Sequence, residues 1–211
     1  MQESPIGPDR DSAVPGGTGR FCLVRKRGRL YFAVLLTIYG FFNVASSNAQ
    51  QARPTESQVK AAYLFNFGKF VHWPVASLSQ TDSLEICVLG KNPFGSVLDA
   101  TVKGETIGGK SVTSRTVPSL RDGAACNIVY VSMSEEGRLS SILSEAKQLS
   151  ALTVSDIPHF AQRGGMIEFV NQEGRIRFEV NAAALVEARL TVSSELLKVA
   201  VKVTDKRAGG D

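Results

Sequence analysis

The sequence predicts an α/β fold, a three-layer sandwich whose mainly parallel central sheet has helices on both faces and a C-terminal antiparallel hairpin. Two observations predict it. Between residues 84 and 154, short apolar runs alternate with helical patterns, which is typical of a parallel sheet covered by helices. After residue 165, two runs separated by a turn are typical of a hairpin. We expect residues 50–205 to form a single domain.

The first element is expected to be a helix over residues 56–72. Thr55 and Gln58 form a capping box at its start, and Pro74 prevents its continuation. Apolar residues at helical spacing predict the face that packs on the core: Val59, Ala62, Tyr63, Phe67 and Phe70. An exposed aromatic surface for a partner is the alternative role for the end of this helix.

Four short apolar or alternating runs predict strands at residues 84–89, 112–117, 128–131 and 151–154. Asn92 and Pro93 predict the start of a helix that reaches about Ala100, because Asn is a good N-cap and Pro suits the first helical position. Ser134 is expected to cap a further helix that continues through Lys147.

The hairpin is predicted from residues 166–170 and 175–180. In its second strand Ile176, Phe178 and Val180 alternate with charged residues, which indicates one buried face. Closing helices are expected over residues 182–188 and 193–203, followed by a disordered tail over 206–211.

Residues 1–49 have the layout of an N-terminal extension followed by a signal peptide. A basic stretch around Arg25 precedes an apolar run from Leu30 to Ala45, and Ser47-Asn48-Ala49 has small residues where a signal peptidase reads. We therefore expect export to the periplasm with cleavage after Ala49. An uncleaved inner-membrane anchor is the alternative.

Removal of this leader changes the charge of the chain. Six of the 24 basic and three of the 20 acidic residues lie in 1–49, so the remainder has 18 basic and 17 acidic residues. The mature part is thus nearly neutral, and its charge does not indicate nucleic-acid binding.

Two of the three cysteines, Cys87 and Cys126, follow the leader. An even number in an exported chain favours a disulfide. It would close a loop of about 40 residues and add about 4 kcal/mol of stability by chain-entropy arithmetic. Two buried reduced thiols on separate strands are the alternative.

Several motifs that could indicate chemistry have structural explanations. Residues 104–111, GETIGGKS, match the letters of a P-loop. A P-loop needs a strand before it and a helix after it, whereas the reverse is expected here, so we predict a Gly-rich turn. His72 and His159, the only histidines, have no partner at metal-ligand spacing, and no G-x-S-x-G motif is present. The sequence predicts neither an enzyme, nor a metal site, nor a cofactor.

The stretch from Ser155 to Gly165, SDIPHFAQRGG, follows a predicted buried strand. Loops beyond the carboxyl ends of parallel strands are where ligands and partners bind. Asp156 is expected to cap a helical turn at Ile157, and the Gly164-Gly165 pair to allow positive φ. These structural roles explain the stretch, and part of a recognition surface is the alternative.

Several segments, taken in order, resemble the YfiR-type family of periplasmic proteins over nearly all of residues 57–203. They are KAAYLFNFGKFVHWP (60–74), ICVLG (86–90), CNIVYVS (126–132), LTVSD (152–156), GGMI (164–167), RIRFEVN (175–181) and LTVSSELL (190–197).

The resemblance implies an exported α/β domain without catalytic activity. It implies a repressor that binds the periplasmic sensing domain of an inner-membrane diguanylate cyclase, YfiN in the family's best-known case, and so lowers cyclic di-GMP and limits biofilm formation. An outer-membrane-associated lipoprotein would relieve the repression. The resemblance also pairs Cys87 with Cys126 as a disulfide. The family's second cysteine pair falls near Val154 and Ala161, where this chain has no cysteine, so redox control through that bond is not expected here.

We expect the partner-binding surface to combine the loop with the hairpin, and Phe160 to be its apolar anchor. The residues assigned to it are Asp156, Phe160, Arg163, Gly164, Gly165, Met166 and Arg177. A small-molecule sensor or carrier without a cyclase partner, with a cleft at the carboxyl edge of the sheet, is the alternative function. A homodimer is the alternative to a monomer.

Overall fold

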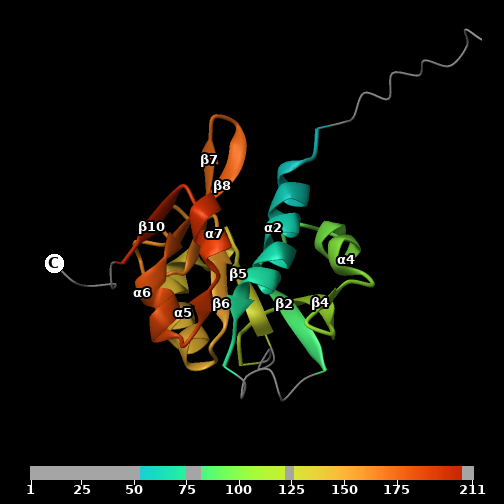
Figure 1. The fold of residues 1–211 in the computed structure, drawn as a ribbon, viewed down its shortest axis with the longest axis horizontal. Helices are drawn as coiled ribbons and strands as arrows, with labels where there is room; N and C mark the ends of the chain where they lie inside the picture. The colour runs from blue at the N-terminus through green and yellow to red at the C-terminus, as the bar shows by residue number, and fades with distance from the viewer. Residues whose placement is uncertain (1–52, 75–81, 122–125, 206–211) are drawn as a thin grey trace, which may run out of the picture. The chain divides into compact units, whose positions relative to one another are not determined.

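An eight-stranded sheet forms the centre of the protein in a computed structural model that describes residues 53–74, 82–121 and 126–205 (Figure 1). In sheet order its strands are β10 (Lys202–Thr204), β8 (Arg175–Asn181), β7 (Ile167–Gln172), β6 (Leu152–Ser155), β5 (Cys126–Val131), β2 (Ser83–Leu89), β4 (Lys110–Val117) and β3 (Thr106–Ile107). The β7–β8 and β3–β4 pairs are antiparallel and the others are parallel. The predicted mainly parallel sheet and its C-terminal hairpin are confirmed.

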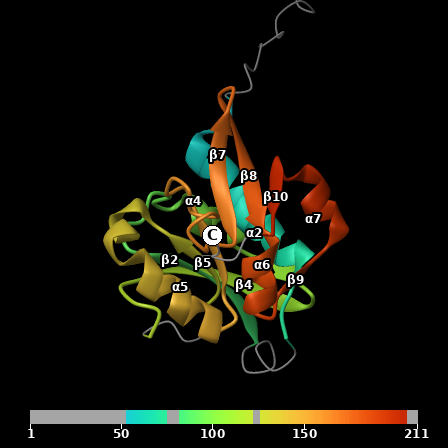
Figure 2. The same ribbon diagram turned by 90° about the vertical axis from the view of Figure 1, so that its left-hand side faces the viewer.

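Helices cover both faces of this sheet, as predicted. On one face α2 (Glu56–Phe70) and α4 (Val97–Val102) share a core with Ile86 and Val88 of β2. On the other face α5 (Leu139–Gln148) shares a second core with Cys87 and Leu89 of the same strand. Figures 1 and 2 show α2 and α5 on opposite sides of the central strands. The alternation along β2 therefore divides the molecule into three layers.

The signal peptide, its cleavage site and the disordered tail were predicted for residues 1–49 and 206–211, which lie outside the described residues. Among the helices of the described residues, none combines the length and the apolar character that crossing a membrane requires.

The capping box of α2 is confirmed. The Thr55 hydroxyl accepts a hydrogen bond from the Gln58 amide at 3.3 Å, and the Gln58 side chain accepts one from the Thr55 amide at 2.8 Å. The helix ends at Phe70, earlier than predicted, because residues 71 and 72 form β1 (Val71–His72), antiparallel to β9 (Thr191–Val192).

The predicted buried face of α2 is partly wrong. Ala62 and Phe70 are exposed, whereas Ala61, Leu64 and Gly68 are buried. A Cβ atom on Gly68 would lie 2.7 Å from the Ile107 side chain. The small residues of the helix therefore face the sheet, where they allow close approach. The spacing of the aromatic residues predicted the wrong rotation of α2 about its own axis.

Two predicted helix starts are also wrong. The Asn92 side chain accepts a hydrogen bond from the Phe94 amide at 2.8 Å and closes a turn, so α4 begins only at Val97. Ser134 lies within a 3-10 helix, η1 (Met133–Arg138), and its hydroxyl accepts a hydrogen bond from the Lys91 amide at 3.0 Å. Both side chains bond to loops instead of capping the expected helices.

The segment predicted as a helix over 193–203 divides into α7 (Ser194–Val199) and strand β10. The Val201 amide donates to the Phe178 carbonyl at 3.0 Å, and the residues that follow pair as strand β10 with the edge of β8 that would otherwise be open. The helix predicted over 182–188 is present as α6 (Ala182–Glu187). The P-loop-like stretch is the predicted Gly-rich turn, with Gly108 and Gly109 at positive φ between β3 and β4.

The disulfide predicted between Cys87 and Cys126 is present. It joins the neighbouring strands β2 and β5, with Cα atoms 5.7 Å apart, and both residues are buried in the core under α5. Trp73 lies at the opposite face of the same strand pair, where its indole donates to the Asn127 carbonyl at 3.2 Å. The bond therefore braces the centre of the sheet.

Replacement of both bonded cysteines, Cys87→Ala with Cys126→Ala, is expected to lower the free energy of unfolding by about 4 kcal/mol, because the unfolded chain regains the entropy that the closed loop removes. Denaturant titration of the variant and of the wild-type chain with and without reductant measures it. A difference below about 1 kcal/mol would contradict a structural role for the bond.

Candidate functional site

The loop between β6 and β7, residues 156–166, leaves the carboxyl edge of the parallel sheet. At its start the Ser155 hydroxyl donates to the Val131 carbonyl at 2.7 Å and accepts from the Ile157 amide at 3.0 Å. Ser155, and not Asp156 as predicted, therefore closes the turn at Ile157. The reason is that β6 continues through Ser155, which places its side chain inside the sheet edge and leaves Asp156 beyond it.

Asp156 instead forms an ion pair with a buried lysine. Lys60 of α2 lies 2.6 Å from Asp156 and 2.5 Å from Glu56, and its side chain is only 8% exposed. The Tyr130 hydroxyl of β5 also lies beside Asp156, and the Phe169 ring lies 6.0 Å from the Lys60 ammonium. A buried charge is tolerated only when it is paired and hydrogen-bonded, so this cluster ties α2 to the loop.

The environment of the cluster shifts two pKa values. Burial lowers the pKa of Lys60, but hydrogen bonds to Asp156 and Glu56 and the charges of both carboxylates outweigh it, so that the pKa is raised above 10.5. Burial, together with the negative charge and hydrogen bond of Asp156, strongly raises the pKa of Tyr130. At neutral pH Lys60 is therefore charged and Tyr130 neutral.

The middle of the loop is held by Glu168, a buried acidic residue of β7. Its carboxylate accepts hydrogen bonds from the His159 amide at 2.9 Å and the Ala161 amide at 3.0 Å. Asn181 of β8 donates from its side chain to the Ala161 carbonyl at 2.7 Å. These bonds fix the backbone around His159, whose φ of 60° is uncommon for a residue other than glycine.

Neither Glu168 nor Asn181 was predicted from the sequence as part of this site. The only signal was an acidic residue at an inward position of a strand and an Asn at the end of the next strand. A polar side chain at such a position must find a buried partner, but the pattern does not identify the partner.

Phe160, predicted as the apolar anchor of the partner-binding surface, is fully buried. It packs in the core beneath α5 with Ile142 and Ile157. A Cβ atom on Gly165 would lie 2.1 Å from the Phe160 ring, so the glycine provides the space into which the ring folds. Phe160 therefore cannot be a surface anchor. The glycine pair predicts only a turn, whereas Gly165 also leaves room for a large side chain beneath the loop, and of the two glycines only Gly164 has positive φ.

The other predicted site residues are distributed over different surroundings. Arg163 is exposed and donates to Glu136 at 2.7 Å, and Asp156 and Gly164 are half-buried. Met166 is buried. Arg177 lines a separate cavity of about 790 Å³ between the start of α2 and the hairpin. Asp156 and Arg163 thus lie on the same loop but pair with different elements, α2 and η1. Arg177 belongs to the hairpin, whose turn extends beyond the rest of the sheet (Figures 1 and 2).

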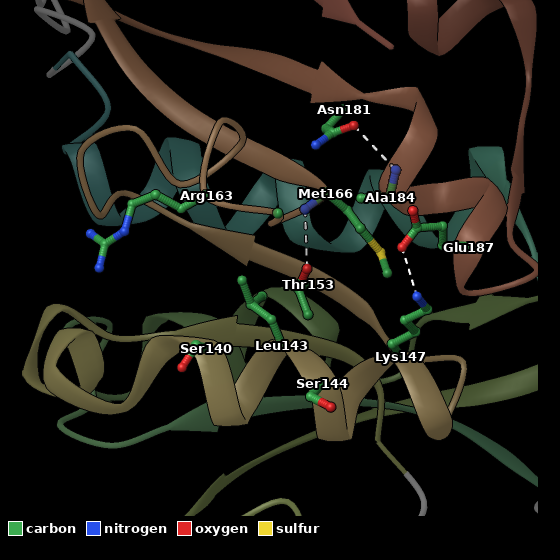
Figure 3. Close-up of a pocket in the computed structure, with 11 residues that line it drawn as sticks. Ser140, Leu143, Ser144, Lys147, Thr153, Arg163, Met166, Asn181, Ala184 and Glu187 are labelled. Atoms are coloured by element: carbon green, nitrogen blue, oxygen red, sulfur yellow. Dashed lines mark hydrogen bonds and ion pairs between the residues drawn. The ribbon is translucent and has the colours of Figure 1, made fainter. Parts of the chain in front are cut away.

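A second cavity, of about 260 Å³, opens between α5 and α6 beside the loop (Figure 3). It is lined by Ser140, Leu143, Ser144, Lys147, Thr153, Arg163, Gly164, Met166, Asn181, Ala184 and Glu187. One ion pair, from Lys147 to Glu187 at 2.7 Å, joins the two helices across it.

A cleft for a small molecule was expected at the carboxyl edge of the sheet, and in the structure the strand order reverses at this edge between β2 and β5. The chain's own η1 packs across this point: Ser134 bonds to the Lys91 amide, and a Cβ atom on Gly90 would lie 2.4 Å from Glu135. The cavity between α5 and α6 therefore lies away from the expected place.

Among the described residues, one group has metal-ligand types close together, namely Glu85, Cys87 and Cys126, with ligand atoms within 4.8 Å. Both cysteine sulfur atoms are bonded to each other in the disulfide, and the Glu85 carboxylate forms an ion pair with Arg115 at 2.6 Å. This group does not fit a metal ion, because thiolates are the ligands that metals require from cysteine.

Comparison with known proteins gives one family. The model of a family described as YfiR/HmsC-like matches residues 57–201. No protein with a curated description matches the chain.

Solved structures give weaker similarity. A conserved domain protein from Vibrio cholerae O1 biovar El Tor has 12% identity and a TM-score of 0.44, over 57% of this chain and 54% of its own. The ABC domain from Streptococcus pneumoniae in complex with L-Trp has 13% identity and a TM-score of 0.47, over 68% and 60%. The chain thus spans less than two thirds of either structure.

Replacement of Gly165 by Ala is expected to lower the free energy of unfolding by about 2 kcal/mol, because the added Cβ displaces the Phe160 ring. Gly137→Ala is the matched control, since an added Cβ there meets no atom within 4 Å. Denaturant unfolding measures both variants. Equal stability of the two would show that the loop does not need the close contact.

The stability of the protein is expected to fall as the pH rises above about 10. The folded state raises the pKa of Tyr130, mainly by burial, and it also raises the pKa of Lys60. Each raised pKa adds stability below the unfolded-state value, which is 10.0 for Tyr130 and 10.5 for Lys60, and this stability is lost as the pH rises above that value. Tyr130→Phe removes one of these contributions, so its free energy of unfolding should fall less steeply than that of the wild type. Urea titrations from pH 8 to pH 11 test this, and identical slopes would contradict it.

Proposed function

The chain belongs to the YfiR/HmsC-like family, and from this premise we propose that it is an exported periplasmic regulatory protein that inhibits a membrane-bound diguanylate cyclase through the cyclase's periplasmic sensing domain. Members of this family are regulatory proteins and are not known as enzymes. Inhibition would lower cyclic di-GMP. An outer-membrane-associated lipoprotein that competes for the same surface would relieve it.

The observation that carries the proposal is the fixed conformation of the loop 156–165. Glu168, Asn181 and Ser155 hold its backbone from below, while Pro158, His159, Gln162 and Arg163 remain exposed above. A loop that is already ordered loses little conformational entropy when a partner binds, which suits a docking surface.

The docking surface that we propose differs from the one expected from sequence. Asp156, Arg163 and Gly164 contribute accessible atoms, and Arg177 adds a cation on the hairpin. Phe160, Gly165 and Met166 support this surface from within, because they are buried.

Repression by docking requires a difference in affinity between two states of the cyclase. The protein would bind the inactive state of the sensing domain more tightly than the active state and shift the population toward it. A ratio of about 10⁴ in affinity is needed to move the cyclase from almost fully active to almost fully inactive.

The disulfide supports export, because such bonds persist in oxidising compartments such as the periplasm. The proposed leader over residues 1–49 would direct the chain there, with cleavage after Ala49. Whether the exported form is a monomer or a homodimer is an outcome of sedimentation measurements.

Charge reversal at Arg163 is expected to weaken binding to the sensing domain of a cyclase encoded beside this chain by about tenfold or more, because it removes a rim cation and its pair with Glu136. Arg121→Glu is the control, since this side chain is 88% exposed and pairs with α5. Biolayer interferometry with the purified sensing domain measures both variants.

Deletion of the gene is expected to raise cellular cyclic di-GMP, and the wild-type chain to restore it. Absence of binding to the sensing domain, together with unchanged cyclic di-GMP in the deletion strain, would end the proposal.

A second function, as a small-molecule sensor or carrier without a cyclase partner, is favoured by the cavity between α5 and α6. This cavity includes Arg163, Gly164 and Met166, so a ligand there would contact the base of the same loop. The two functions are compatible if the ligand changes the affinity of the loop for its partner.

A further inference from the structure

We infer that the cavity between α5 and α6 binds a small organic carboxylate with a short apolar body. This inference deepens the second function proposed above and does not depend on a cyclase partner. The floor of the cavity, its apolar walls and its ion pair each contribute an independent observation.

The floor has two buried polar side chains with hydrogen-bonding capacity left over. The Thr153 hydroxyl accepts from the Met166 amide at 3.1 Å, and the residues that the structure describes supply no acceptor for its hydrogen. The side-chain amide of Asn181 donates one of its two hydrogens to the Ala161 carbonyl, and the described residues supply no acceptor for the second hydrogen. Both residues are about 1% exposed, so each unused donor favours a ligand acceptor.

A cation at the rim adds to these donors. Lys147 has three N–H groups, and its ion-pair partner is Glu187 at 2.7 Å. Arg163 also lines the cavity, but its side chain points away from Lys147 and pairs with Glu136 (Figure 3). The buried donors of the floor and the Lys147 ammonium therefore border the same cavity, and the ligand chemistry that such a set accepts is an anion with two oxygens.

The walls between floor and rim are apolar. Leu143 of α5 and Ala184 of α6 face each other across the cavity, and the Met166 side chain extends between the helices toward the ion pair (Figure 3). A bare phosphate would leave these groups without contacts, whereas a carboxylate with an apolar tail covers them. The volume of about 260 Å³ lies just below the usual range for ligand pockets, so the ligand has on the order of five to eight heavy atoms.

The ion pair from Lys147 to Glu187 is a competitor of the proposed ligand. Both side chains are partly exposed, at 49% and 34%, so the pair itself contributes little to stability and exchanges readily. A bound carboxylate would take the place of Glu187 on Lys147. Loss of Lys147 should therefore weaken binding, and loss of the Glu187 charge should strengthen it.

Methyl NMR of the full chain with ¹³C-labelled methionine provides the test. Of the three methionines, Met166 lines the cavity and Met133 is exposed on η1, so each spectrum contains its own control. Titration with hexanoate is expected to shift the Met166 signal with a Kd of roughly 0.1–1 mM and to leave Met133 unchanged. Hexanamide and hexylamine, which match its size, should bind at least about tenfold more weakly.

Two variants distinguish a ligand-binding site from an ion pair that only joins α5 to α6. Lys147→Gln is expected to weaken hexanoate binding by about three- to tenfold, and Glu187→Gln to strengthen it by a similar factor. Lys198→Gln, at an exposed lysine of α7, is the control and should not change it. A Met166 signal that hexanoate does not move, equal binding of hexanamide, or a change of the same sign in both variants would overturn the inference.

Discussion

The ion pair between Lys60 and Asp156 joins the helix that covers one face of the sheet to the loop that leaves the sheet's carboxyl edge. A lysine that is 8% exposed must keep its charge compensated, so the native positions of α2 and the loop depend on each other. Tyr130 and Glu56 complete the compensation. The start of the loop is therefore fixed by the packing of α2, although the two are 96 residues apart in sequence.

Within that frame the polar residues of the loop hold its structure, and its outer surface stays accessible to the partner that we propose. Glu168 accepts a hydrogen bond from the Ala161 amide, Asn181 donates one to the Ala161 carbonyl, and Phe160 fills the space beneath the loop. The mixture of Ser, Asp, His, Arg and Gly in this stretch resembles a catalytic loop in composition only. In the described residues its Asp156 carboxylate pairs with Lys60, and its Ser155 hydroxyl closes a turn.

The sequence was sufficient to predict most of the helices and strands, but it was not sufficient to predict how they contact one another. Continuous apolar runs predicted the buried strands, and the capping box predicted the start of α2, because both signals are local. The rotation of α2 depended on Gly68 meeting Ile107, and the burial of Phe160 depended on Gly165, neither of which a spacing rule contains. The cavity between α5 and α6 arises from elements that are distant in sequence, and its only advance signal was that Arg163 and Met166 flank the glycine pair.

The central claim is that the loop is ordered before any partner binds, and native-state hydrogen exchange of the free chain tests it most directly. The amides of His159 and Ala161, both bonded to Glu168, should exchange as slowly as core amides of β6, while that of Gln162 exchanges quickly. Addition of the cyclase sensing domain should then slow exchange at the exposed loop residues. Fast exchange at all three amides in the free chain would contradict the claim, because the loop would then have to fold on binding.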